Sequence, residues 1–284
     1  MFDFAIRNLL LYFKDRTAVL LSFLAEFIVI GLYILFIRDN LLEQFSGIQN
    51  VDVLMDVWMI AGILGITSVT TTMGAYGIMV DDKVKKIEMD FWISPIRRDA
   101  ILSGYMISAV VIGFIMTMIL FLLSGIYIFQ FYKVRLGAGN MGFLFCVMLI
   151  NTMANSSMVL FLVSFLRSSN ALASCCTIAG ALIGFLTGIY LPIGNLPESV
   201  QWLVKCFPVS HGVVLFRQIL SEPLLDESFK GMQAGIMLEF MEFMGIRYTF
   251  EERFIPVRIS IAVLFAAGGL FLILTMLKYK ISRK

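Results

Sequence analysis

The segment from Asp81 to Asp99 carries the densest group of ionisable side chains in the chain, with ten charged residues in nineteen positions. Five are basic and five are acidic, and Val84, Ile87 and Phe91 recur among them at the spacing of an amphipathic helix. A surface that binds lipid headgroups is usually one-sidedly basic. We interpret the balanced charges as a docking surface for a second protein, with a solvated loop as the alternative.

Glu26 interrupts an otherwise uncharged run from Thr17 to Ile37. It follows Arg16 by ten residues, which at 1.5 Å per residue places it about 15 Å into a membrane, near the midplane. A carboxyl group at that depth is costly and is expected to face the protein interior. Glu26 either contacts a cationic or polar substrate on a path through the membrane or hydrogen-bonds, in protonated form, to a neighbouring helix.

Three further polar residues lie within apolar runs. Asn151 and Asn155 are four residues apart, so they share one helix face and could line a cavity or hydrogen-bond between helices. Thr71 belongs to a group of hydroxyl residues that offers the same two possibilities, although such side chains also bond back to their own helix. These residues join Glu26 as candidates for a path through the membrane.

Several kinds of chemistry are excluded by what the sequence lacks. His211 is the only histidine, which rules out a multi-histidine metal site. No Gly-Lys pair occurs, so the G-x-x-x-x-G-K-[ST] phosphate cradle is missing, and so is the G-x-S-x-G nucleophile elbow. We expect no catalytic residue, metal, cofactor or nucleic acid on this chain. The four cysteines have no metal-binding spacing, and pairing of Cys146 with Cys206 stays open.

The elements that position these residues are membrane-spanning helices. The chain is 60% hydrophobic and 15% charged, whereas soluble domains are about 45–50% apolar and about 25% charged. A helix needs roughly 20 apolar residues to cross a membrane. The apolar runs predict an all-α integral membrane protein, a single domain over residues 1–284 with six spans at residues 17–37, 57–80, 104–129, 142–166, 171–191 and 257–278.

The segments between the spans complete the predicted architecture. Residues 1–16 have apolar side chains on one face and charges on another, which is typical of an interfacial amphipathic helix. Residues 81–99 form the charged loop. Residues 192–254 form a long loop on the opposite side, with short helices that re-enter the membrane between spans five and six. Pro208, His211 and Arg217 lie in this loop, where hydrogen bonding within the fold is the default role of the last two.

The distribution of charge predicts the orientation. If both termini lie inside, the inner segments carry 13 Lys and Arg residues and a net charge of +6, and the outer segments carry 9 and a net charge of −3. Basic residues accumulate on the cytoplasmic side of membrane proteins. We therefore expect a multi-pass protein of the cell membrane with both termini and the charged loop in the cytoplasm.

Two motifs resemble those of a known family. Ser94-Pro95-Ile96-Arg97-Arg98, followed by Ile101-Leu102 and Gly104, is similar to the loop after the second span of type-2 ATP-binding-cassette (ABC) exporter permeases. Phe207–Arg217, FPVSHGVVLFR, resembles the last outer loop of the same family, and the predicted interfacial helix and six spans also match. One departure is that the Gly-Thr found before the proline motif in many members is missing here.

The resemblance implies a membrane subunit that dimerises, as a homodimer or heterodimer, and binds a separate ATPase subunit that holds ATP and magnesium. In such permeases the first cytoplasmic loop faces the ATPase, so this role is carried over to Lys83, Lys86, Glu88, Asp90, Pro95, Arg97 and Arg98. The outer helices with Pro208, His211 and Arg217 would shape an exit gate. Membrane lipid is the remaining expected partner.

These observations favour the permease of an ABC exporter for a hydrophobic drug, an antimicrobial peptide or a lipid-like molecule. Export of polysaccharide or lipid-linked glycan is the first alternative. A secondary carrier is disfavoured because the spans hold almost no ionisable groups that could bind a coupling ion. A non-transporting membrane scaffold is the third possibility. The sequence leaves the substrate open.

Overall fold

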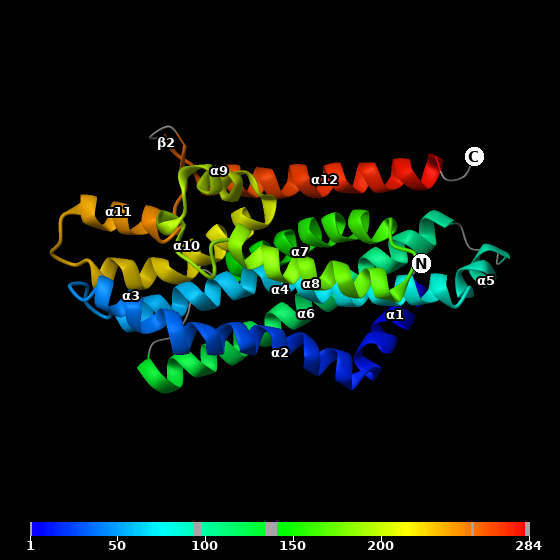
Figure 1. Ribbon diagram of the computed structural model, residues 1–284, viewed down its shortest axis with the longest axis horizontal. Coiled ribbons are helices and arrows are strands. Elements are labelled where there is room, and N and C mark those ends of the chain that lie inside the picture. The colour runs from blue at the N-terminus through cyan, green and yellow to red at the C-terminus, as the bar shows by residue number, and fades with distance from the viewer. Residues whose placement is uncertain (1, 94–97, 134–140, 251–252, 282–284) are drawn as a thin grey trace.

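The computed structural model describes residues 2–93, 98–133, 141–250 and 253–281, without the side chains of Trp92 and Arg98. Its longest helices run roughly along the long axis of the molecule (Figure 1). Helices α1 (Phe2–Lys14) and α5 (Ile87–Ile93) lie at one end, here called the terminal end. Helices α3 (Arg38–Gln44) and α11 (Ala234–Phe243) lie at the other, here called the distal end.

Six helical segments of the described chain are long and apolar enough to cross a membrane, which confirms the predicted all-α membrane fold. The first, Arg16–Gln44, combines α2 (Arg16–Leu32), a π-helical turn (Tyr33–Ile37) and α3. The others are α4 (Val51–Val84), α6 (Arg98–Tyr132), α7 (Met141–Ser164), α8 (Ser169–Leu186) and α12 (Val257–Ile281).

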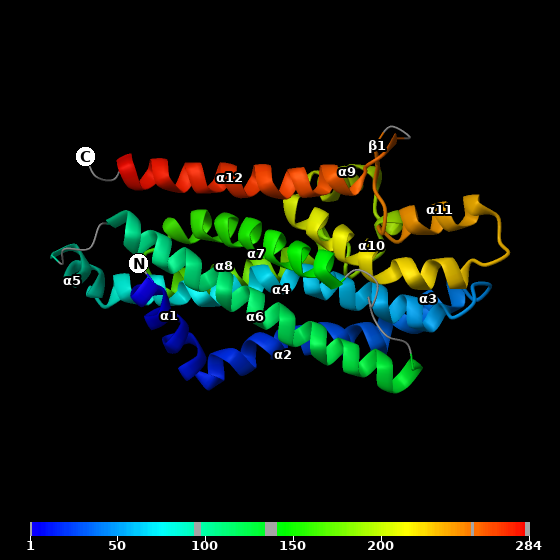
Figure 2. The same ribbon diagram turned by 180° about the vertical axis from the view of Figure 1, so that it is seen from behind.

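Helix α4 is the centre of the bundle. It is buried along most of its length and packs against α6, α7, α8 and α10. Figure 2 shows α6 and α7 on the face opposite to the one where α2 and α8 lie in Figure 1. By contrast, α2 buries only Glu26, and α8 buries only Ile183 and Gly184. These two spans bury the smallest share of their residues among the six, so much of their apolar surface is left uncovered by this chain.

Helix α8 ends at Leu186, whereas the sequence predicted a span to Leu191. Gly188 has a φ of +64°, a conformation that glycine adopts without steric cost. The N–H groups of Gly188 and Ile189 donate to the carbonyls of Phe185 (3.2 Å) and Gly184 (3.0 Å). This pair of bonds is a Schellman motif, which stops the helix although the following residues are apolar.

The segment between α8 and α12 contains one helix longer than predicted. A short 3₁₀ turn (Ile193–Asn195) and α9 (Glu198–Cys206) precede α10 (Pro208–Ser228), and α9 meets α10 at an angle of 87°. Helix α10 has 21 residues and packs between α4, α7 and α12, because residues such as Val213 and Phe216 bury their side chains there. It also continues through Pro223, which ordinarily interrupts a helix. Two antiparallel strands of two residues each, β1 (Thr249–Phe250) and β2 (Arg253–Phe254), precede α12.

Candidate functional site

An ion pair with a buried carboxylate fastens α1 to the terminal end of the bundle. The guanidinium of Arg7 donates to both carboxylate oxygens of Asp82, at 2.8 and 2.9 Å. The hydroxyl of Tyr105, on α6, donates to Asp82 Oδ2 at 2.6 Å. Asp82 is 4% exposed, and donation to its carboxylate raises the pKa of Arg7. One carboxylate thus joins α1, α4 and α6.

Aromatic side chains extend this cluster to α5. The ring of Phe4 makes edge-on contacts with Phe91 (5.0 Å between centres) and with Tyr105 (4.9 Å). The Arg7 guanidinium lies 5.5 Å from the Phe4 ring and 5.3 Å from the Phe91 ring, within the range of a cation–π interaction. We call Phe4, Arg7, Asp82, Phe91 and Tyr105 the anchor cluster. It holds α5 against the spans.

Four of the seven predicted docking residues, Lys83, Lys86, Glu88 and Asp90, have described positions in or beside the turn from α4 to α5. Lys86, with a φ of +59°, makes the turn between α4 and α5. Asp90 is exposed on α5, whereas Glu88 and Lys83 line a cavity on the other side of the cluster. Pro95, Arg97 and the side chain of Arg98 lie outside the described residues. Their contact with a partner stays a prediction.

Glu26 faces the bundle, as its depth in the membrane predicted. It is 3% exposed, and the Thr70 hydroxyl on α4 lies 3.0 Å from its Oε1. Its Oε2 is buried without a hydrogen-bond partner among the described residues. The contact with Thr70 is the interhelical bond that the sequence allowed. The free Oε2 leaves room for a second donor.

Substitution of Glu26 separates its two possible roles. We expect Glu26→Gln to keep the bond from Thr70 and the packing of α2 on α4, and Glu26→Leu to lose that bond, at a cost of about 1 kcal/mol. If Glu26 contacts the substrate, both variants lower transport at unchanged folded yield. The measurement is protection of expressing cells against a panel of hydrophobic drugs and antimicrobial peptides. Full protection by both variants removes the substrate contact.

The other path candidates lie in closely packed helix contacts. Asn151 Nδ2 donates to the Gly65 carbonyl and to Ser68 Oγ, both at 3.0 Å. Asn155 Nδ2 donates to Ser68 Oγ at 2.8 Å and to Asn151 Oδ1 at 3.1 Å. Thr71 donates to the carbonyl of Thr67, in its own helix, at 2.6 Å. This geometry accounts for all three residues as bonds within and between helices, and a contact with substrate stays a prediction.

Arg217, predicted at an exit gate, joins the ends of two helices at the distal end. Its Nη2 donates to the Gly188 carbonyl at 2.8 Å, and its Nη1 lies 3.3 and 3.4 Å from the carbonyls of Met244 and Gly245. The guanidinium carbon is 4.4 Å from the centre of the Trp58 ring, whose Nε1 also donates to Met244. These carbonyls lie one or two residues beyond the ends of α8 and α11, where helix dipoles favour a cation.

His211 also serves a helix end. Its Nε2 lies 3.0 Å from the carbonyl of Lys205 in the last turn of α9, so Nε2 is the protonated nitrogen. Its Nδ1 lies 3.1 Å from the hydroxyl of Ser260 on α12. Pro208 is the first residue of α10, where its missing N–H costs nothing. These contacts agree with the default structural role, and a gate stays a prediction.

A buried carboxylate at the distal end was missed by the sequence analysis. Asp56 accepts from Tyr33 (3.2 Å), Arg38 (2.9 Å), Tyr127 (3.1 Å) and Tyr132 (2.6 Å). Tyr33 and Arg38 are five residues apart, and the π-helical turn brings both to one face because the Arg38 N–H donates to the Tyr33 carbonyl. The π-helical turn cannot be anticipated from spacing.

A cavity of about 170 Å³ adjoins Asp56, between α2, α4 and α6. Its wall is apolar apart from Asp56, Ser124 and the two tyrosines Tyr33 and Tyr127. Because all four donors are directed at Asp56, the carboxylate is already satisfied. The cavity is suited to an apolar group rather than to a cation.

The four cysteines are free in this structure. Cys146 lies on α7 and Cys206 at the end of α9. The pairing of Cys146 with Cys206 that the sequence left open is not formed.

Comparison with known proteins places the chain in a family. The family described as "ABC-2 type transporter" matches residues 4–221, from α1 to the middle of α10. The match includes the anchor cluster, five of the six spans and Arg217. No curated protein matched the chain. The chain belongs to the ABC-2 type transporter family and is a multi-pass membrane permease, a domain that has no ATPase site of its own.

Proposed function

We propose that this permease is the membrane subunit of an exporter that moves a hydrophobic drug, an antimicrobial peptide or a lipid-like molecule out of the cell. ATP and magnesium would be bound, and ATP hydrolysed, by a separate ATP-binding-cassette subunit. The observation that carries this proposal is the anchor cluster, which holds α1 and α5 to the spans. A movement imposed on α5 by a soluble partner would therefore reach α4 and α6 directly.

The two faces of α5 differ as a docking helix requires. Phe91 packs inward on Phe4. Met89 and Ile93, four residues apart, are 56% and 86% exposed, and the acidic Asp90 is exposed beside them. An apolar pair flanked by charge suits a protein partner better than bulk water. This surface supports the predicted contact with the ATPase subunit.

The charge distribution supports placing the terminal end in the cytoplasm of a cell-membrane protein. The loop and terminal segments assigned to that side have a net charge of +6, against −3 for those on the other side. The ATPase subunit, which needs cytoplasmic ATP, would then meet α5. Both chain termini would be cytoplasmic.

The uncovered surfaces of α2 and α8 support a second permease subunit. Large apolar side chains are exposed along both helices, among them Leu20 and Phe27 on α2 and Phe185 on α8. Lipid covers part of such a surface, and a second copy or a sister permease would cover the rest. The apolar cavity beside Asp56 supports a hydrophobic substrate over a polysaccharide.

Co-purification tests the proposed function. We expect the permease, co-expressed with an ATP-binding-cassette subunit from the same genome, to yield a complex with two permease and two ATPase chains. The double substitution of Met89 and Ile93 by aspartate is expected to lower ATPase recovery about tenfold, because charge would enter an apolar contact. The matched control is Ile236→Asp, an exposed apolar residue on α11 at the distal end. Recovery that is unchanged in the α5 variant contradicts the docking assignment.

A further inference from the structure

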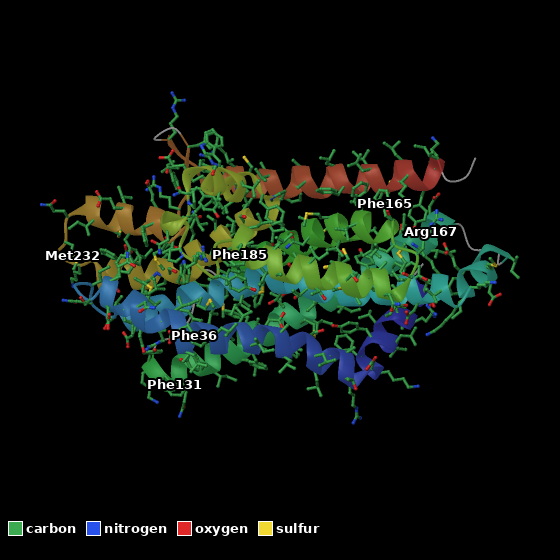
Figure 3. The ribbon with its side chains drawn as sticks, in the orientation of Figure 1. Phe36, Phe131, Phe165, Arg167, Phe185 and Met232 are labelled. Carbon is green, nitrogen blue, oxygen red and sulfur yellow. The ribbon has the colours of Figure 1, made fainter. Side chains whose placement is uncertain are left out.

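A second cavity, of about 520 Å³, opens at the terminal end, between α4, α6, α7 and α12. Three cationic side chains line it: Lys83 on α4, Arg167 in the turn after α7, and Lys278 in the last turns of α12. Figure 3 shows Arg167 at this end of the bundle, with Phe165 beside the C-terminal half of α12. No part of the anchor cluster except Tyr105 borders this cavity.

None of the three cations makes a salt bridge within the described residues. The Lys278 ammonium donates to Ser164 Oγ at 2.9 Å and lies 3.4 Å from the centre of the Phe165 ring. Both contacts hold Lys278 in place, and neither cancels its charge.

The acidic residues of the cavity compensate the charge of Lys83 more than that of Lys278. Glu88 and Asp99 also line the cavity. The charge of Glu88 attracts Lys83, whereas the charges that act most strongly on Lys278 are those of Lys83 and Arg167, both repulsive. Like charges held together cost free energy unless an anion joins them. The corner formed by Arg167 and Lys278 is therefore suited to an anionic group.

The apolar part of the cavity wall indicates which kind of molecule bears the anionic group. Ile101, Leu102 and Phe165 make part of the cavity apolar, and Phe165 is 57% exposed. The corner lies where α7 ends and α12 completes its last turns, the depth at which lipid phosphates meet a membrane-spanning helix. An amphipathic anion fits both the cations and the apolar wall.

We propose that this cavity binds the phosphate of an anionic phospholipid from the adjoining leaflet, with Arg167 and Lys278 as its principal contacts and Lys83 as the third. Arginine can hold two phosphate oxygens at once, and lysine adds a point charge. The acyl chains leave along the apolar wall towards the bilayer. The site rests on the membrane location of the chain and not on the direction or substrate of transport.

Native mass spectrometry of the purified permease in detergent with added phosphatidylglycerol or phosphatidylcholine tests the site. We expect the wild type to retain phosphatidylglycerol preferentially. The double variant Arg167→Gln with Lys278→Gln should lower that retention about tenfold, as the loss of two charge-assisted contacts predicts. Lys85→Gln with Lys280→Gln, which removes the same charge from exposed positions at the same end, should lower it less than twofold.

Thermal unfolding of the same samples shows whether a variant loses lipid because it is misfolded. Without lipid, the Arg167 and Lys278 variant should be at least as stable as the wild type, because repulsion is removed. Added phosphatidylglycerol should raise the melting temperature of the wild type and of the control variant only. Equal loss of lipid in both double variants, or no preference for phosphatidylglycerol in the wild type, overturns the proposal.

Two further outcomes would assign the cations to another ligand. Complete displacement of phosphatidylglycerol by 10 mM inorganic phosphate, at about the affinity of the lipid, would point to a soluble phosphate. If the Arg167 and Lys278 variant recovers less ATPase subunit but retains lipid as the wild type does, the cations would contact a protein. Either result overturns the lipid assignment.

Discussion

Replacement of Arg217 by methionine is expected to lower the free energy of unfolding by about 3 kcal/mol. The carbonyls of Gly188 and Gly245 accept from no other donor among the described residues, and each buried acceptor left without a donor costs about 1–3 kcal/mol. Methionine fills much of the arginine volume, so the loss reports on the hydrogen bonds. Relief from burying a cation offsets part of the loss.

A second variant separates charge from geometry at this position. Arg217→Lys keeps the cation but cannot reach the ends of two helices while stacking on Trp58, so we expect it to be destabilised almost as strongly. Arg258→Met removes an exposed arginine on α12 and should leave unfolding unchanged within about 0.5 kcal/mol. The measurement is unfolding in mixed detergent micelles. Wild-type stability of Arg217→Met would show that the ends of α8 and α11 are held to α10 by apolar packing alone.

The contrast between Glu26 and Asp56 shows what the sequence could predict. Glu26 stands alone in an apolar run, so counting residues from Arg16 was enough to predict its burial. Asp56 lies just before the uncharged run that marks the second span, in a stretch that also contains Asp52, and so falls outside the span predicted at residues 57–80. Its burial depends on a π-helical turn and on tyrosines more than 70 residues away. No local pattern encodes those contacts.

The same distinction holds for helix boundaries. Apolar runs predicted six spans because a membrane imposes its thickness on every one of them. They could not predict that α8 stops at Leu186, since the signal is the conformation of a single glycine, Gly188, within residues that remain apolar. They also missed the length of α10, because Pro223 is an interruption in most helices and is tolerated here. The spacing of apolar residues thus predicts where a span lies, whereas the residues at which a helix stops or continues depend on backbone conformation that spacing does not encode.

Double substitution of Arg7 and Asp82 by leucine is expected to separate stability from coupling. Arg7→Leu alone leaves the carboxylate of Asp82 buried with only Tyr105 as a donor, which should cost about 2–3 kcal/mol. This is less than for a fully buried pair because the Arg7 side chain is 32% exposed. Asp82→Leu alone should cost less, since the arginine can reach water. The double variant should be more stable than Arg7→Leu alone, because two apolar groups replace the pair, and the cost that remains is that of the Tyr105 hydroxyl without its acceptor.

The coupling of transport to ATP hydrolysis should stay impaired in the double variant even where its stability recovers. If the Arg7–Asp82 pair transmits the movement of α5 to α4 and α6, the double variant still folds and binds the ATPase subunit. Its transport per ATP hydrolysed should nevertheless fall about fivefold or more, the range typical of a lost coupling between two sites. The measurement is transport and ATP hydrolysis by the reconstituted complex, with Lys14→Leu, an exposed cation on the same helix, as the control. Wild-type transport per ATP in a stable double variant would leave the pair as a fastening of α1 and nothing more, and would assign coupling to the apolar contact between Phe4 and Phe91.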